Sequence, residues 1–288
     1  MKQKIYTPFQ RLILTGLFSL FSCVFAYSAV AFEQKSQGTS KSSLRLIAAT
    51  TEWQGETKTF AGIEIRLAPK WKTYWRTPGD TGIPPYFDWS GSENLKSAEV
   101  MYPIPARYED PIGITIGYKS QVTLPVLLTP IDPSKPIKLN LSAQYAICYD
   151  LCVPVSASQK LTVDQAETNR FAPLLSMALS LTPKPVTQDD EGPGVKQVRM
   201  SEEAQQPFLT LNVAVPESSQ KVDLFVEGPD GLYVPTPELV KGQGEGKGRK
   251  LYKINLADVD EPKQFQDLVL TCTLRADDVA VVHPCRVE

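Results

Sequence analysis

The feature that most constrains the fold of this chain is a series of short runs rich in β-branched and aromatic residues, each ended by proline or glycine. Three of these runs in the first half are Lys58–Ala68, Val122–Thr129 and Ile137–Tyr145. Apolar and polar residues alternate in the last of them, which is the period of a half-buried strand. The 24 prolines and 17 glycines are spread through the chain and argue against long helices. The pattern predicts an all-β protein built as a β-sandwich.

The chain divides near its middle into two strand-rich parts. Residues 44–165 carry the first part and residues 197–288 carry the second, whose strand-like runs are Phe208–Val215, Val222–Glu227 and Gln266–Leu274. A chain of 288 residues exceeds the usual size of one domain, so we expect two β-domains. The Gly-rich segment at 242–248 lacks the Lys-Ser/Thr ending of a phosphate loop, and we interpret it as a hairpin loop.

The segment 166–196 between the two parts has a different pattern. Apolar residues recur at three- and four-residue spacing, which predicts a short amphipathic helix; they are Phe171, Leu174, Leu175, Ala178 and Leu179. Pro183 and Pro185 should end this helix. The polar stretch Thr187–Lys196 contains glycine and proline, and we expect it to be a linker.

The N-terminus has the organisation of a secretory signal peptide. Its basic leader contains Lys2, Lys4 and Arg11. Residues 12–31 are uncharged and end in Ala29-Val30-Ala31, a pattern that signal peptidase cuts. We therefore expect a periplasmic protein whose mature chain begins at Phe32. An uncleaved membrane anchor and a lipoprotein modified at Cys23 are the alternatives.

Charge argues against binding to nucleic acid. Cleavage after Ala31 would remove three of the 30 basic residues and none of the 32 acidic ones, which leaves a net charge of about −5. A phosphate backbone is held by an excess of Lys and Arg, which this chain lacks.

Four cysteines remain after cleavage: Cys148, Cys152, Cys272 and Cys285. An even number of cysteines in an oxidising compartment predicts two disulfides. The sequence allows three connectivities, and the short spacings favour pairing 148 with 152 and 272 with 285.

Cys148 and Cys152 lie at the tip of a predicted hairpin, on either side of Tyr149-Asp150-Leu151. A three-residue turn would place the two cysteines directly opposite each other, with Cα atoms about 4.5–5.5 Å apart, which a disulfide can bridge. So small a loop contributes little closure entropy, which favours an exchanging disulfide over a structural one. Pro154 has no N–H for ladder pairing, so we expect its strand at a sheet edge, with Cys152 accessible and Cys148 enclosed.

Two other interpretations of this cysteine pair are weaker, and a third stays open. Two cysteines with the single His283 cannot complete a four-ligand zinc site, so we expect no metal. A thioredoxin motif needs Cys-x-x-Cys at a helix start, whereas these cysteines are one residue further apart and lie on strands. A structural cross-strand bridge remains the alternative.

We expect Cys272 and Cys285 to form a structural disulfide within a C-terminal hairpin. A two-residue turn at Asp277-Asp278 would pair Cys272 with His283. Cys285 would then be a diagonal neighbour at about 7–8 Å, so we expect a bulge or a shifted turn to bring the cysteines together.

Several motifs in the first half resemble one family. They are the stretches Trp71–Asp88, Trp89–Ser92, Arg107–Gly113, Gly117-Tyr118, Thr123–Thr129 and Tyr145–Pro154. Together they resemble the N-terminal periplasmic domain of the thiol:disulfide interchange protein DsbD. The three-residue cysteine spacing and the WKTYWRTPGD stretch are more similar still to the related suppressor of copper sensitivity protein ScsB. The resemblance covers residues 44–165 well and is fainter over 190–288, where ScsB-like relatives carry a second β-domain.

The resemblance implies an immunoglobulin-like fold and a redox cysteine pair. Cys152 matches the cysteine that forms mixed disulfides, and Cys148 matches the cysteine that resolves them. In the family a cap loop shields the pair with an acidic residue and an aromatic one. The matching residues are Asp110 and Ile112, so the acid is present and the aromatic is not. Tyr74 matches a site tyrosine, and an ordinary turn acid and strand aromatic are the alternatives for Asp110 and Tyr74.

The resemblance also implies partners. We expect electrons to come from a membrane-embedded thiol reductant of the DsbD/CcdA type and to pass to periplasmic thioredoxin-like or disulfide isomerase proteins. The sequence ends at Glu288 without a membrane domain or a thioredoxin-like domain, so we expect either that a separate membrane protein supplies the electrons or that the domain has become a binding module. Exchange of this kind needs no diffusible cofactor and would make the chain a component of a protein-disulfide reductase. A non-catalytic assembly module and a copper- or stress-linked redox sensor are the alternatives.

Overall fold

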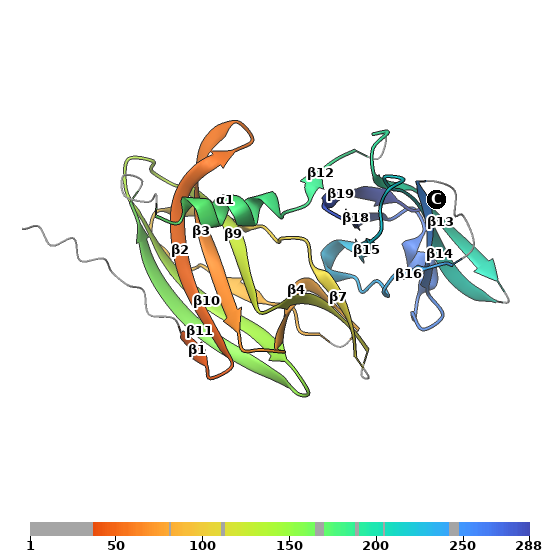
Figure 1. Cartoon of the computed structure of the whole chain (residues 1–288), viewed down its shortest axis with the longest axis horizontal. Coiled ribbons are helices and arrows are strands. Elements are labelled where there is room, and N and C mark those ends of the chain that lie inside the picture. Colours follow the sequence, from red (N-terminus) through yellow and green to blue (C-terminus); the bar gives the residue numbers. More distant parts are fainter. Residues whose placement is uncertain are drawn as a thin grey trace, which may run out of the picture. The chain divides into compact units, whose positions relative to one another are not determined.

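The computed structural model describes residues 37–80, 82–110, 113–164, 170–187, 190–203, 205–241 and 248–288, which all belong to one compact unit. Regular structure in these residues is almost entirely β-strand, so the all-β prediction is confirmed (Figure 1). The signal peptide predicted at residues 1–31 and most of the Gly-rich segment 242–248 lie outside the described residues.

Two sheets form the N-terminal sandwich. The first sheet contains, in order, β1 (Gln37–Thr39), β2 (Ser42–Trp53), β3 (Glu56–Leu67), β9 (Gln121–Pro130) and β6 (Leu95–Val100). The second sheet contains β11 (Cys152–Val163), β10 (Ile137–Cys148), β4 (Lys72–Gly79), β8 (Gly113–Lys119) and β7 (Ala106–Asp110), with the short β5 (Tyr86–Asp88) paired to β10. β11 and β7 are therefore the two edges of the second sheet.

The alternation predicted over Ile137–Tyr145 determines which face of β10 meets the core. Its inward side chains are buried, whereas most of those between them are exposed. These inward residues are Ile137, Leu139, Leu141, Ala143 and Tyr145. The runs Lys58–Ala68 and Val122–Thr129 likewise fall on β3 and β9, so the three strand predictions of the first half are confirmed.

The C-terminal sandwich has two further sheets and a core of its own. One sheet contains β12 (Lys184–Pro185), β19 (Val279–Arg286), β18 (Val269–Ala276) and β15 (Val222–Glu227). The other contains β13 (Gly194–Glu203), β14 (Gln206–Ala214), β17 (Arg249–Asn255) and β16 (Glu238–Leu239). Short 3-10 turns, η2 (Pro229–Gly231) and η3 (Pro262–Phe265), lie in its connections.

The predicted helix is α1 (Ala172–Ser180), which lies against β2, β3 and β9 (Figure 1). Its Leu175 and Leu179 pack on Ile47 and Phe60 of the first sheet. Gly62 makes room for this contact, because a Cβ at this position would lie 2.8 Å from a methyl carbon of Leu175. The predicted linker is shorter than expected, because β13 already begins at Gly194.

Candidate functional site

Cys148 is the last residue of β10 and Cys152 is the first residue of β11. The two residues are direct cross-strand partners and form a disulfide, with Cα atoms 4.1 Å apart. Tyr149, Asp150 and Leu151 make the turn between the strands, so the predicted hairpin geometry is confirmed. The Cα distance is slightly shorter than the range expected for opposed residues.

The two sulfurs differ in their environments. Cys148 is only 2% exposed, whereas Cys152 is half-buried and follows the exposed Leu151. β11 is an edge strand of its sheet, as the proline at 154 predicted, and Pro154 is itself exposed. A partner approaching the hairpin tip therefore meets Cys152 before Cys148.

Tyr74 on β4 contacts the cysteine pair directly. Its hydroxyl lies 3.0 Å from Cys152 Sγ, and its ring packs with Ala146 and Cys148 in a small buried cluster. A disulfide sulfur carries no hydrogen, so the tyrosine O–H donates this hydrogen bond. The resemblance identified this residue, and the structure places it at the disulfide.

Lys72 is a neighbour of the pair that sequence reasoning missed. It lies directly opposite Cys148 on β4, so both side chains lie on the same face of the sheet. The lysine is only 3% exposed, and its Nζ lies 5.8 Å from the centre of the Tyr108 ring. A positive charge on the sheet face that carries the cysteines would favour a thiolate over a thiol. The signal available in the sequence was the two-residue spacing of Lys72 and Tyr74, which puts both on one face of a strand.

The predicted cap loop is only partly described. Asp110 is the last residue of β7 and pairs with Gly113 at the start of β8. The side chain of Asp110 and the whole of Pro111 and Ile112 lie outside the described residues. The shielding roles of Asp110 and Ile112 therefore stay predictions.

Cys272 and Cys285 form the second disulfide, and both cysteines are fully buried. The predicted turn at Asp277-Asp278 is confirmed, because Ala276 pairs with Val279 and Cys272 pairs with His283. The prediction of a bulge or a shifted turn is wrong, since the turn is unshifted and the register between β18 and β19 is regular. The Cα atoms of the cysteines lie 6.1 Å apart. The twist between neighbouring strands brings one of the two diagonals closer, so a diagonal pair can be bridged without a bulge.

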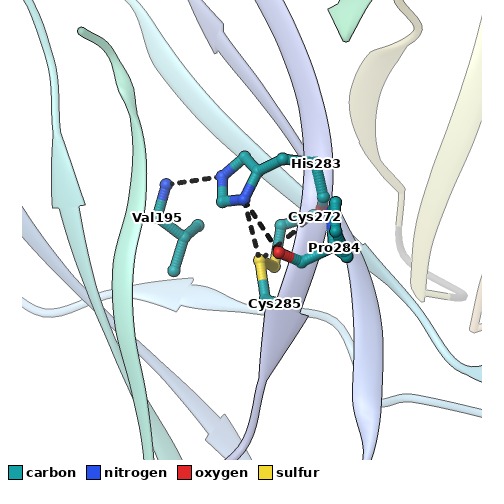
Figure 2. The surroundings of a disulfide bond; sticks show 5 residues. All are labelled: Val195, Cys272, His283, Pro284 and Cys285. Atoms are coloured by element: carbon teal, nitrogen blue, oxygen red, sulfur yellow. Dashed lines mark hydrogen bonds between the residues drawn. A yellow bond between two sulfur atoms is a disulfide. The ribbon is translucent and has the colours of Figure 1, made fainter. Parts of the chain in front are cut away.

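His283 lies beside this second disulfide and links the two sheets of the C-terminal sandwich (Figure 2). Its Nε2 accepts a hydrogen bond from the backbone N–H of Val195 at 2.9 Å. The proton of the neutral ring is therefore on Nδ1, which lies 3.1 Å from the carbonyl oxygen of Pro284 and 3.7 Å from Cys285 Sγ. Burial lowers the pKa of His283, so the ring is held in its neutral form.

A cross-strand disulfide at the tip of a sandwich hairpin, with one enclosed and one accessible sulfur, is the arrangement of a thiol:disulfide interchange domain. The family model of the N-terminal domain of thiol:disulfide interchange protein DsbD matches residues 45–164. The match covers most of the first sandwich, including both cysteines of the hairpin.

A solved structure extends the likeness to both sandwiches. The N-terminal periplasmic domain of ScsB from Proteus mirabilis matches with a TM-score of 0.64 and 18% sequence identity. The match covers 87% of this chain and 94% of that domain. At this identity the likeness establishes the immunoglobulin-like fold. A search of curated proteins found no match.

Two further observations concern the described residues alone. They contain no helix that is both long and apolar enough to cross a membrane. They also contain no group of three or more His, Cys, Asp or Glu side chains placed to hold a metal ion.

Proposed function

We propose that this chain carries out thiol:disulfide exchange in the periplasm, with Cys148 and Cys152 cycling between a dithiol and a disulfide. The observation that carries the proposal is the asymmetry of the pair at the hairpin tip. Cys152 is half-buried at an edge strand, and Cys148 is enclosed one strand further in. A relay needs one sulfur that a partner can reach and one that releases the partner.

The exchange proceeds in two balanced steps. The Cys152 thiolate attacks one sulfur of the partner's disulfide, forms a mixed disulfide and displaces the other partner sulfur as a thiolate. Cys148 then loses its proton and attacks Cys152 Sγ, which forms the Cys148–Cys152 disulfide and displaces the second partner thiolate. The partner gains two electrons and takes up two protons, and this chain is oxidised by the same amount.

Tyr74 and Lys72 support this chemistry from β4. The Tyr74 hydroxyl can donate to Cys152 Sγ when that sulfur becomes a thiolate, and a hydrogen bond to the charged form favours ionisation. Lys72 lies directly opposite Cys148 on the same sheet face, and a positive charge on that face would favour the thiolate of the resolving sulfur.

The short loop closed by Cys148 and Cys152 also favours an exchanging disulfide over a structural one. Its cysteines are four residues apart, whereas those of the second disulfide are 13 apart. The closure entropy that a disulfide removes from the unfolded chain grows with loop length, so the shorter loop contributes less stability.

The proposed partners follow from the family. A membrane-embedded thiol reductant would reduce the disulfide, and thioredoxin-like or isomerase proteins of the periplasm would receive the electrons. A copper- or stress-linked sensor would use the same cysteines without an obligate client.

Trapping tests the assigned roles. Cys148→Ala should accumulate a mixed disulfide with an oxidised thioredoxin-like protein, because the resolving sulfur is missing, and Cys152→Ala should not. Non-reducing electrophoresis with mass spectrometry identifies the linked peptides. Equal trapping by both variants contradicts the roles, and trapping by neither favours a structural bridge in a non-catalytic module.

A further inference from the structure

Strand β4 touches the cysteine pair with its first residues and the C-terminal sandwich with its later ones. Lys72 pairs with Cys148 across the β10 ladder, and Tyr74 contacts Cys152. The ladder between β4 and β8 then breaks, since Tyr74 pairs with Gly117 and the next pair joins Gly79 to Thr115. Residues 75–78 therefore leave the regular ladder immediately after the site tyrosine.

Side chains of β15 hold this irregular segment. Glu227 accepts two hydrogen bonds from the Arg76 guanidinium, at 2.8 and 2.7 Å, and one from the Thr77 hydroxyl at 2.8 Å. Phe225 meets the ring of Trp75 edge to face, with ring centres 5.6 Å apart. Residues 75–78 are therefore held by a bidentate ion pair and an aromatic contact with the other sandwich, where the regular pairing with β8 is interrupted.

The alternation of β15 explains how one strand serves two cores. Leu224 and Val226 face the core of their own sandwich. Asp223, Phe225 and Glu227 share the opposite face, because successive side chains of a strand alternate. Phe225 is 0% exposed and belongs to the core of the N-terminal sandwich.

A second ion pair from the same face reaches the edge strand β7. Asp223 accepts hydrogen bonds from the Arg107 guanidinium, with the shortest distance at 2.8 Å, and Arg107 also donates to the carbonyl oxygen of Leu224. Both ion pairs are partly buried, and removal of one partner leaves the other desolvated and unpaired. The contact between β15 and the N-terminal sandwich therefore combines two ion pairs of defined geometry with an apolar contact.

We propose that the face of β15 formed by Asp223, Phe225 and Glu227 positions Tyr74 against Cys152, so that the C-terminal sandwich is a working part of the exchange site. The inference rests on the proposed function only in that Cys152 is taken as the sulfur that reacts with a partner. Glu227 and Phe225 are positioning residues, since they act through β4 and touch neither sulfur.

The physical link is the sensitivity of a hydrogen bond to the position of its donor. A donor displaced by a fraction of an ångström loses much of its bond, and functional groups are held within about 0.5 Å by their supporting residues. Release of residues 75–78 from β15 should let the Tyr74 hydroxyl move away from Cys152 Sγ. The Cys152 thiolate then loses a donor and forms less readily.

The test measures ionisation of Cys152 without any protein partner. In a Cys148→Ala background, iodoacetamide alkylates Cys152 over a range of pH, and the midpoint of the rate profile reports thiolate formation. Glu227→Gln and Tyr74→Phe should each raise this midpoint and lower the rate near neutral pH at least about twofold, the lower end of couplings within one network. The double variant should match Tyr74→Phe alone, because Glu227 acts through Tyr74.

A matched control separates positioning from general loosening. Glu64 is buried and forms a bidentate ion pair with Arg45 in the first sheet, so Glu64→Gln removes a comparable interaction elsewhere. It should leave the midpoint unchanged. Arg76→Lys keeps the charge but loses the bidentate fork, and it should shift the midpoint in the same direction as Glu227→Gln.

Several results would overturn the inference. These are an unchanged midpoint in both Glu227→Gln and Arg76→Lys, additive shifts in the double variant, or an equal shift in Glu64→Gln. Failed trapping by a partner protein together with the expected alkylation profiles would refute the relay and leave the positioning role intact.

Discussion

Lys72 and Cys148 are direct cross-strand partners on β4 and β10, so a buried lysine shares a sheet face with the cysteine pair. Exchange reactions depend on thiolates, and a nearby cation stabilises the thiolate form. We therefore expect Lys72 to promote ionisation of the resolving sulfur.

The first prediction concerns that cation. Lys72→Met should slow the step in which Cys148 resolves a mixed disulfide about fivefold, which corresponds to about 1 kcal/mol for a charge pair. Stopped-flow measurement of product release from a preformed mixed disulfide gives the rate. Lys119→Met is the control, because Lys119 lies one strand further away and contacts the same Tyr108 ring. Equal slowing in both variants would contradict a specific role for Lys72.

The second prediction concerns the pH dependence of stability. Burial lowers the pKa of His283 below its ordinary value of 6.5, whereas the unfolded chain keeps that ordinary value. The unfolded state therefore binds more protons, and the contribution of His283 is complete above pH 6.5 and is lost as the pH falls toward the folded pKa. Each unit of difference between the two pKa values is worth about 1.4 kcal/mol.

His283→Gln isolates this effect. Its amide oxygen can accept the Val195 hydrogen bond but does not titrate, so the stability curve should be flatter below pH 6.5 than that of the parent chain. The charge of Lys196 lowers the pKa of the His283 ring, and the charge of Asp190 raises it. Urea unfolding at several pH values measures the slopes, and identical slopes for the two proteins would show that His283 does not contribute.

The third prediction contrasts the two disulfides. Replacement of Cys272 and Cys285 by alanine should cost about 3 kcal/mol of unfolding free energy, because their loop is long, and fully buried sulfurs are removed as well. Replacement of Cys148 and Cys152 should cost about 2 kcal/mol or less. Denaturant unfolding of the two double variants gives both values. A larger loss at the hairpin tip would indicate that the Cys148–Cys152 bond is mainly a brace.

The fourth prediction concerns export. Protein isolated from the cell envelope should begin at or near Phe32, because we interpret the Ala29-Val30-Ala31 pattern as a signal-peptidase site. N-terminal sequencing of the purified protein is sufficient. An intact Met1 in a membrane fraction would instead identify an anchor.

The sequence alone determined the local geometry of the cysteine hairpin. Alternation over Ile137–Tyr145 identified the buried face of β10, and three residues between the cysteines placed them opposite each other. The same reasoning paired Cys272 with His283 across the second hairpin. These features follow from the two-residue period of a strand and from the length of a turn, which act between residues close in the chain.

Only the tertiary structure decided which strands lie beside the cysteines. The contact of Tyr74 with Cys152 spans 78 residues, and the hydrogen bonds of Arg76 to Glu227 span 151. The alternation of β15 indicates two faces but not that Phe225 enters the core of the other sandwich. Such contacts depend on how sheets pack and which edges meet, and the side-chain period of a single strand carries no information about either.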